Sequence, residues 1–216
     1  MNRSELTFFL LGKKYGFNLK KMLKFVNENQ YWDEERIFQY QVLHFQNVIK
    51  HAYEHTTYYR SIMDERGLKP SSFQNLSDLK LLPIISKKII NQRWNDFIAD
   101  NANQFRPMHR VTSGTTGLTF KYYIDTKSWA LNWATKMRTF SWGGYIFGKD
   151  KIATLKGGSM LRRAKPSLNS KIWKYLNNNY DLSVIHLSDD NMENYYQQIL
   201  DKRILYLRGF PSAVYT

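Results

Sequence analysis

A short segment rich in glycine and hydroxyl groups carries the clearest chemical signal in the sequence. It consists of Thr112, Ser113, Gly114, Thr115, Thr116 and Gly117. The two glycines allow the backbone to turn sharply, and the hydroxyls can donate hydrogen bonds to phosphate oxygens beside exposed backbone N–H groups. This combination predicts an anion-binding loop. A hydroxyl-rich hairpin turn with no ligand is the alternative that the residues alone leave open.

A second pattern suggests a metal site. His51 and His55 stand four residues apart, so they share one face of a predicted helix, and Glu54 lies between them. Two histidines and a glutamate in this order match the inverted zinc-peptidase pattern, in which the glutamate acts as general base. The sequence offers no identifiable third protein ligand. A structural histidine pair near the end of a helix is therefore the favoured interpretation.

A third pattern nearly matches the phosphate-binding loop of P-loop ATPases. The segment Gly143–Asp150 ends in Gly-Lys-Asp, so Asp150 stands where a Ser or Thr should bind magnesium. The segment also follows a predicted helix instead of a strand. Its bulky residues Tyr145, Ile146 and Phe147 suit packing better than a close approach to phosphate. The sequence therefore predicts a structural turn here.

The elements that must position these residues fall into two groups. Residues 1–104 are predicted to be mainly helical, with helices over 19–27, 33–55, 59–65 and 87–97 begun or ended by Asp33, Gly67 and Ser86. Residues 105–216 are predicted to form an incomplete α/β nucleotide-binding region of the same domain. Its expected strands are 110–112, 120–124, 151–156, 182–187 and 204–207. The first expected helix begins at Asp125 or Thr126, and the second covers 169–176. The third covers 192–201 with Asp189 as its cap, and the last begins at Pro211 or Ser212. Alternating strands and helices predict an α/β fold with some parallel pairing.

Composition limits the class of protein. The chain has 216 residues, 43% of them hydrophobic, which is enough for an ordinary globular domain. It has no cysteine, which excludes a disulfide scaffold, a thiolate metal site and a cysteine nucleophile. No segment approaches the roughly 18 consecutive apolar residues that span a bilayer, and the N-terminus lacks a signal-peptide cleavage pattern. These features predict a cytoplasmic protein.

The net charge of +14 favours anionic partners such as nucleotides, coenzyme A, nucleic acid or the inner leaflet of a membrane. The basic residues are spread along the whole chain, usually singly or in pairs, and no basic arm is visible. Charge by itself does not choose among these partners.

Residues 112–117 resemble the phosphate-loop motif of adenylate-forming enzymes, the acyl-CoA synthetase superfamily. Four further segments resemble the N-terminal region of phenylacetate–CoA ligases: 51–60, 76–87, 144–150 and 208–215. They occur in consistent order over most of the chain, and they are most similar to the capsular-polysaccharide-biosynthesis, or CapK-like, branch. In that family the 51–55 helix and the 143–149 turn are ordinary structural segments.

The resemblance implies the N-terminal domain of an enzyme that activates a small carboxylate with ATP and Mg²⁺. The acyl-adenylate is then transferred to an acceptor such as the thiol of coenzyme A. Residues 113–117 would hold the β- and γ-phosphates, with Thr115 or Thr116 as the main hydroxyl donors and Lys121 as the nearby basic residue. The resemblance also implies association with polysaccharide-biosynthesis machinery and no nucleic-acid partner.

The sequence departs from the family pattern in several places. Thr119 replaces a common proline after the loop, and Thr57 replaces another before the tyrosines. The family's aromatic-Gly-x-Thr-Glu motif, ribose-binding aspartate, hinge and C-terminal catalytic lysine are not found in the 216 residues. We therefore expect an N-terminal fragment that does not catalyse the full reaction alone. The alternative from another class is a non-catalytic basic module that binds a membrane surface or nucleic acid.

Overall fold

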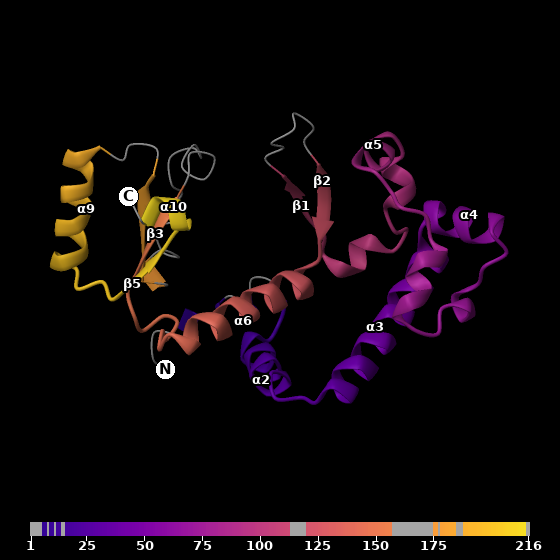
Figure 1. Cartoon of the computed structure of the whole chain (residues 1–216), viewed down its shortest axis with the longest axis horizontal. Coiled ribbons are helices and arrows are strands. Elements are labelled where there is room, and N and C mark those ends of the chain that lie inside the picture. The colour runs from indigo at the N-terminus through magenta and orange to yellow at the C-terminus, as the bar shows by residue number, and fades with distance from the viewer. Residues whose placement is uncertain are drawn as a thin grey trace. The chain divides into compact units, whose positions relative to one another are not determined.

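The computed structural model describes residues 6–7, 9–10, 12–13, 16–112, 120–156, 175–176, 178–184 and 188–214 (Figure 1). The chain divides into two units. Unit 1 consists of Met1–Val26 and Ala130–Thr216, and unit 2 consists of Asn27–Trp129. Helices α2 (Leu19–Asn29) and α6 (Thr126–Trp142) each cross a boundary between the units.

Unit 2 contains a long helix that begins and ends where the sequence predicts. α3 (Glu34–His55) follows Asp33, whose Oδ1 accepts a hydrogen bond from the Arg36 N–H at 2.7 Å. This contact confirms Asp33 as the N-cap, because it pairs one of the free amides of the first turn. Thr56 ends the helix in an extended conformation, and α4 (Thr57–Glu65) begins directly after it.

The core of unit 2 lies between α3, α4 and the segment that follows them. Gly67 ends α4 as predicted: it adopts a positive φ of 64°, a conformation that glycine takes without strain. The chain then returns over α3. The buried residues of this core are Ile49, Met63 and Phe73, and the half-buried side chains around them are Phe45, Tyr53, Leu68, Leu81 and Leu82.

A polar contact at the surface joins α3 to α4 and to the residue where the chain turns back. The Tyr53 hydroxyl donates to Asp64 Oδ1 at 2.8 Å, and Lys69 Nζ donates to the same oxygen at 2.8 Å. The Lys69 ammonium, followed by the Tyr53 hydroxyl, lowers the pKa of the Asp64 carboxyl. The carboxylate is thereby kept ionised at the junction of the two helices.

The next part of unit 2 consists of short helical turns. These are η1 (Pro70–Ser72), η2 (Leu76–Leu81), α5 (Lys87–Gln92), η3 (Trp94–Phe97) and η4 (Ala102–Phe105). Ser86 caps α5 as predicted, with its Oγ accepting from the Ile89 N–H at 3.3 Å.

The predicted continuous helix over 87–97 is wrong, because the α-helix ends at Gln92 and a separate 3₁₀ turn follows. Arg93 leaves the helical conformation, its Nε donates to Asp96 at 2.7 Å, and its guanidinium lies over the Tyr58 ring. The new direction stacks Phe97 on Tyr58, with ring centroids 4.1 Å apart. Tertiary packing of aromatic rings has overridden the local helical pattern.

Unit 2 also contains the hairpin that the sequence predicts around residues 113–118. β1 (Met108–Val111) pairs antiparallel with β2 (Lys121–Ile124), in a register from Met108↔Ile124 to Val111↔Lys121. The two strands lie side by side in Figure 1. The Asp125 side chain then accepts from the Ser128 N–H at 2.8 Å, which confirms it as the start of α6.

Unit 1 contains a small parallel sheet, which confirms the predicted α/β class. β3 (Ile152–Lys156) is the central strand, with β4 (Asn179–Ser183) on one side and β5 (Tyr206–Arg208) on the other, both parallel to it. The first four residues of β3 are buried. This is typical of a parallel strand covered on both faces.

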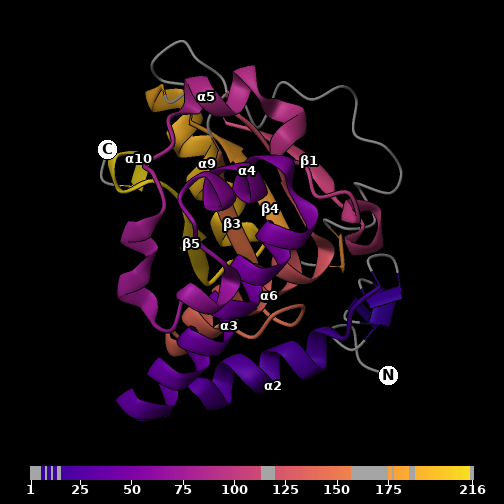
Figure 2. The same cartoon turned by 90° about the vertical axis from the view of Figure 1, so that its right-hand side faces the viewer.

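Helices cover the two faces of this sheet (Figures 1 and 2). On one face, Tyr195 and Ile199 of α9 (Asp189–Asp201) pack against buried Leu155 and Leu182. On the other face, Ile152 belongs to a second cluster, to which α6 contributes Met137, Trp133 and Phe140. Its buried residues are Met137, Tyr145, Phe147 and Ile152, and the half-buried ones are Leu23, Trp133, Phe140 and Tyr206.

Several predicted boundaries in unit 1 are shifted. β4 begins at Asn179, three residues before the predicted start, and residues 185–187 lie outside the described part of the chain. Ser188 caps α9 instead of Asp189, because its Oγ accepts from the Asn191 N–H and Asp189 is already the first helical residue. β5 begins at Tyr206 because the Ile204 N–H is bonded to the carbonyl of Ile199 at the helix end.

Two other predicted helices of unit 1 have different outcomes. α10 (Pro211–Val214) begins at Pro211, as predicted. Of the helix predicted over 169–176, residues 175 and 176 are helical and 169–174 lie outside the described residues.

The Gly143–Asp150 segment is a packed turn, as its bulky residues predict. Tyr145 and Phe147 are buried, whereas Ile146 is half exposed. The Asp150 carboxylate accepts the Ile146 N–H at 2.6 Å, so it closes the turn on itself. The segment is therefore packed as the predicted structural turn.

Among the helices that the structure describes, none combines the length and the apolar character needed to cross a membrane.

A core substitution should show how much unit 2 depends on its buried cluster. Met63→Ala removes a side chain with 0% exposure, and we expect the free energy of unfolding to fall by about 2–5 kcal/mol. The matched control is Ile84→Ala, because the Ile84 side chain is 100% exposed and its loss should change stability by no more than about 0.5 kcal/mol. Urea denaturation of both variants gives the comparison, and equal losses would contradict this placement of Met63.

Alkaline pH should destabilise unit 1 through Tyr145. Burial raises the pKa of Tyr145 from 10.0 to about 12, with Arg208 opposing and Asp150 reinforcing the shift. The unfolded chain therefore loses this phenolic proton first, and stability present below pH 10 falls as the pH rises towards 12. By pH 11 we expect the wild type to lose about 1 kcal/mol more than Tyr145→Phe. Urea denaturation at pH 9 and pH 11 measures the difference, and parallel losses in the two proteins would refute it.

Candidate functional site

The predicted phosphate loop belongs to the segment that connects β1 to β2 in the sequence. Ser113, Gly114, Thr115, Thr116 and Gly117 are outside the described residues. The residues that flank the loop are described, and they hold its two ends together. Thr112 N–H donates to the Phe120 carbonyl at 2.9 Å, and Phe120 N–H donates to Thr112 Oγ1 at 3.2 Å.

These contacts give Thr112 a definite role in the hairpin. Its hydroxyl oxygen accepts a hydrogen bond from the opposite strand, so it helps to close the loop. The hydroxyl proton is still available as a donor. The last residue of β1 is paired with Lys121, the first residue of β2. Lys121, the basic residue assigned to the phosphate site, therefore lies at the same end of the hairpin as the loop.

A pocket of about 570 Å³ opens beside Lys121 and lies entirely within unit 2. This volume is in the range of small-molecule sites. The pocket is lined by Val48, His51, Ile90, Trp94, Phe97, Ile98, Ala99, Ala102, Phe105, Pro107, Phe120, Lys121, Tyr122, Tyr123 and Asp125. Most of these side chains are aliphatic or aromatic.

Aromatic contacts shape the wall of the pocket. The Trp94 and Tyr123 rings are tilted against each other with centroids 5.5 Å apart, and the Phe120 and Tyr122 rings are nearly parallel at 6.1 Å. Residues 120–123 thus line the pocket with side chains from both faces of the hairpin, and the Lys121 ammonium is one of them. Such a wall can hold an apolar or aromatic group, and the lysine can attract an anionic end.

The sequence analysis did not identify this pocket. The pocket takes Trp94 and Phe97 from a 3₁₀ turn, Phe105 from another, and its tyrosines from a strand. The change of sequence pattern near Phe105 was the only local signal, because side chains from separate turns meet only in the tertiary structure.

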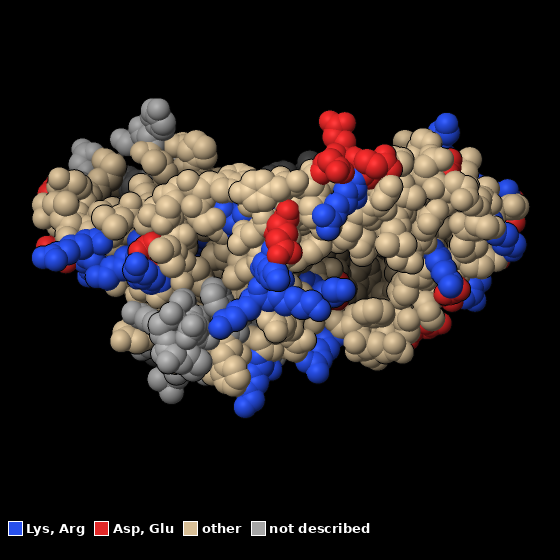
Figure 3. Space-filling model, turned by 90° about the horizontal axis from the view of Figure 1, so that it is seen from below, with Lys and Arg blue, Asp and Glu red and all other residues tan. Residues whose placement is uncertain are grey.

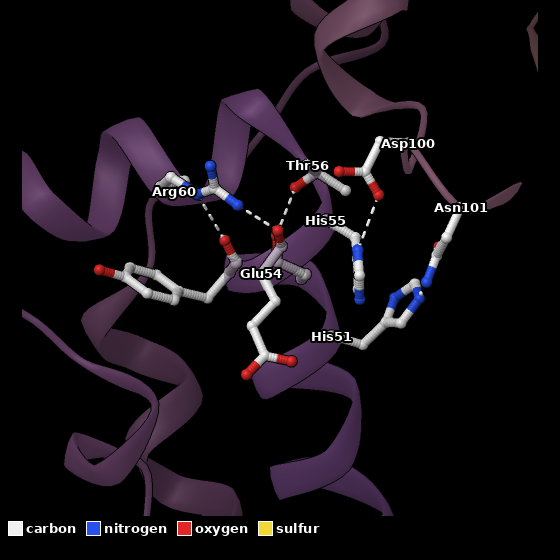
Figure 4. Close-up of polar contacts among 9 residues, drawn as sticks. His51, Glu54, His55, Thr56, Arg60, Asp100 and Asn101 are labelled. Atoms are coloured by element: carbon white, nitrogen blue, oxygen red, sulfur yellow. Dashed lines mark hydrogen bonds and ion pairs between the residues drawn. The ribbon is translucent and has the colours of Figure 1, made fainter.

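The two histidines of the zinc hypothesis are bound to a neighbouring loop (Figure 4). His55 Nδ1 lies 2.7 Å from Asp100 Oδ1, and His51 Nε2 lies 3.1 Å from Asn101 Oδ1. The two rings are close, with centroids 4.8 Å apart, and His51 also lies edge-on to the pocket residue Phe105. One nitrogen of each ring is therefore used to join the end of α3 to residues 100 and 101.

Glu54 does not join the histidines as a general base would. Its side chain is 4.0 Å from Lys50, and in Figure 4 its carboxylate points away from both imidazoles. Within the described residues, no group of three histidine, cysteine or acidic side chains is placed to hold a metal ion. The geometry supports the structural interpretation of the histidine pair.

Arg60 and Thr56 complete the same helix end. The Arg60 guanidinium donates to the main-chain carbonyls of Tyr53, at 3.0 Å, and Glu54, and Thr56 Oγ1 donates to the carbonyl of Ala52 at 2.7 Å (Figure 4). The Arg60 donors reach carbonyls that the last turn of a helix leaves unpaired, whereas the Ala52 carbonyl also accepts the Thr56 N–H at 3.0 Å. The 51–60 segment thus has a structural role next to the pocket.

Comparison with known proteins gives one partial similarity. No protein-family profile matches the chain. A segment of 70 residues is 37% identical to phenylacetate–coenzyme A ligase of Escherichia coli (strain K12). The match covers 32% of this chain and 16% of that ligase, so it spans a small part of the relative's length. The resemblance to phenylacetate–CoA ligases is supported over this segment, whereas the CapK-like branch stays a prediction.

Proposed function

We propose that this chain is the N-terminal part of an ATP-dependent, adenylate-forming ligase. In this proposal, residues 112–117 hold the phosphates of ATP and Lys121 contributes positive charge beside them. The partial similarity to phenylacetate–coenzyme A ligase supports the assignment. The hairpin supports it independently, because it brings the ends of a glycine- and hydroxyl-rich segment together beside a lysine.

Two described residues of the proposed site can contact a triphosphate. Lys121 is exposed and supplies a cation, and Thr112 retains a hydroxyl donor. The nearest carboxylate among the pocket residues, Asp125, is occupied in capping α6 through the Ser128 N–H and hydroxyl. Because Mg²⁺ commonly binds through nucleotide phosphates and few protein carboxylates, it would be held mainly by ATP here.

In the proposed reaction, a carboxylate oxygen attacks the α-phosphorus of ATP, which forms an acyl-adenylate and releases pyrophosphate. An acceptor thiol, with coenzyme A as the leading candidate, then attacks the acyl carbon and releases AMP. The contribution of Thr112, the loop and Lys121 is to bind and orient the β- and γ-phosphates and to stabilise the negative charge on the leaving pyrophosphate. Residues that grip adenosine are not identified in this chain, so we propose that it does not turn over alone.

The remaining parts of the proposal follow from the resemblance. The substrate is a small carboxylate, the cofactors are ATP, Mg²⁺ and coenzyme A, and the location is the cytoplasm. A role in capsular polysaccharide biosynthesis, with association to that machinery, follows from the similarity to the CapK-like branch.

Binding of ATP to the purified chain tests the proposed site. We expect Lys121→Gln to weaken binding of Mg·ATP about tenfold, because it removes one charge-assisted contact to phosphate. Thr115→Ala combined with Thr116→Ala should weaken it by a similar factor. Isothermal titration with Mg·ATP, and competition by pyrophosphate, give the dissociation constants.

Lys127→Gln is the matched control, because Lys127 is an exposed lysine close in sequence that does not line the pocket. Its effect should stay within about twofold, as expected for a solvent-screened surface charge outside the site. An equal loss in Lys121→Gln and Lys127→Gln would show that ATP responds only to overall charge. Binding that is indifferent to Lys121, Thr115 and Thr116 would refute the proposed site.

A further inference from the structure

The positive charge of the chain is concentrated in unit 1. That unit has 19 Lys and Arg residues against 7 Asp and Glu, a net charge of +12. Unit 2 has 13 against 11, a net charge of +2. Although basic residues are spread along the sequence, the acidic residues that neutralise them are mostly in unit 2. The anionic partner suggested by the net charge should therefore bind unit 1.

Helix α2 presents part of this charge on one side. Its buried residues Leu19 and Val26 face the interior, and Leu23 packs against the cluster beneath α6. The intervening lysines Lys20, Lys21 and Lys24 are exposed. The helix is amphipathic: its apolar side packs inside unit 1, and its lysine side is exposed.

Helix α6 extends this basic surface. Arg138 Nη1 donates to the carbonyl of Val26 at 2.8 Å and so joins the two helices. Lys136, two residues earlier, is also exposed, but residues two apart in a helix do not share a face, so it points away from α2. We call Lys20, Lys21, Lys24 and Arg138 the α2–α6 surface.

Neither helix carries an acidic residue within unit 1, since residues 19–26 and 130–142 contain no Asp or Glu. Figure 3 shows blue side chains gathered on the face that carries α2. A surface with this charge attracts a partner with closely spaced negative charges.

Exposed aromatic rings lie next to the cations of unit 1. Trp142 at the end of α6 is 66% exposed, and the Arg138 guanidinium lies over its ring at 5.6 Å. Before α2, Phe9 is 57% exposed with Lys13 Nζ 5.9 Å from its ring centroid. Tryptophan beside basic side chains is typical of segments that sit at the boundary between lipid headgroups and acyl chains.

We propose that the α2–α6 surface docks unit 1 onto a bilayer that contains anionic phospholipid. The lysines would contact the headgroups, and Trp142 would enter the interfacial layer. Each basic residue held near such a bilayer strengthens binding by about fivefold, so three lysines account for on the order of a hundredfold. The surface is separate from Lys121 and the loop, so it would bring a ligase active site to a membrane without taking part in the chemistry.

Vesicle binding by the whole chain tests this proposal. The probes are vesicles of phosphatidylcholine alone and of phosphatidylcholine with about one-third phosphatidylserine, with bound protein measured by co-sedimentation. We expect binding to the anionic vesicles only, and a steep loss with added salt. Replacing Lys20, Lys21 and Lys24 together by Gln should weaken it on the order of a hundredfold.

The control is a variant with the same change of charge in unit 2. Lys80, Lys87 and Lys88 are all exposed, and their joint replacement by Gln should change vesicle binding no more than about twofold. Because Gln has nearly the same helix propensity as Lys, both variants should keep their circular dichroism and melting temperature. If the chain binds these vesicles but does not bind ATP, the proposed function is refuted and the docking proposal is supported.

Three outcomes would overturn the docking proposal. Equal binding to neutral and anionic vesicles would show that the binding does not depend on the charge of the lipid. Equal losses in the two triple variants would show a response to net charge and not to the α2–α6 surface. Binding of a homopolymeric RNA that the Lys20, Lys21 and Lys24 replacement abolishes, with no binding to anionic vesicles, would assign the surface to nucleic acid.

Discussion

The antiparallel ladder between β1 and β2 is the constraint on which the candidate site depends. It places Thr112 opposite Phe120 and Lys121 opposite Val111, so the hydroxyl-rich loop can only leave and re-enter the structure beside that lysine. The same ladder presents Tyr122 and Tyr123 to the pocket. Because four residue pairs fix the register, a slip by one residue would change which β1 residue lies opposite Lys121 and so shift this lysine relative to the ends of the loop.

Local rules predicted those elements whose determinants are close in sequence. Asp33, Ser86 and Asp125 (the last with Thr126 as the alternative) could be predicted as helix starts, because each side chain reaches an amide within the next three residues. The hairpin was also predictable, since both strands flank one loop. These elements define the α/β class and the place of the phosphate loop without any knowledge of the tertiary structure.

Long-range packing determined what the sequence analysis missed. The helix over 87–97 breaks because Phe97 stacks on Tyr58, which lies 39 positions away in the sequence. The pocket likewise combines α3, three short turns and β2, and no single periodicity connects them. The histidine pair was correctly placed on one helix face, but its partners Asp100 and Asn101 come from a separate loop that no spacing rule could supply.

The uneven distribution of charge has a consequence for the energetics of the two units. A body with a net charge of +12 repels itself, and this repulsion favours its expanded states, whereas a body with +2 carries almost no such cost. Any polyanion that binds folded unit 1 more tightly than the unfolded chain shifts the folding equilibrium of unit 1 by mass action. The stability of unit 1 is thereby linked to ionic strength and to the concentration of its anionic partner. The stability of unit 2 is nearly independent of both. In one and the same solution, unit 2 can therefore be folded while the folding of unit 1 depends on the salt and the anionic partner present.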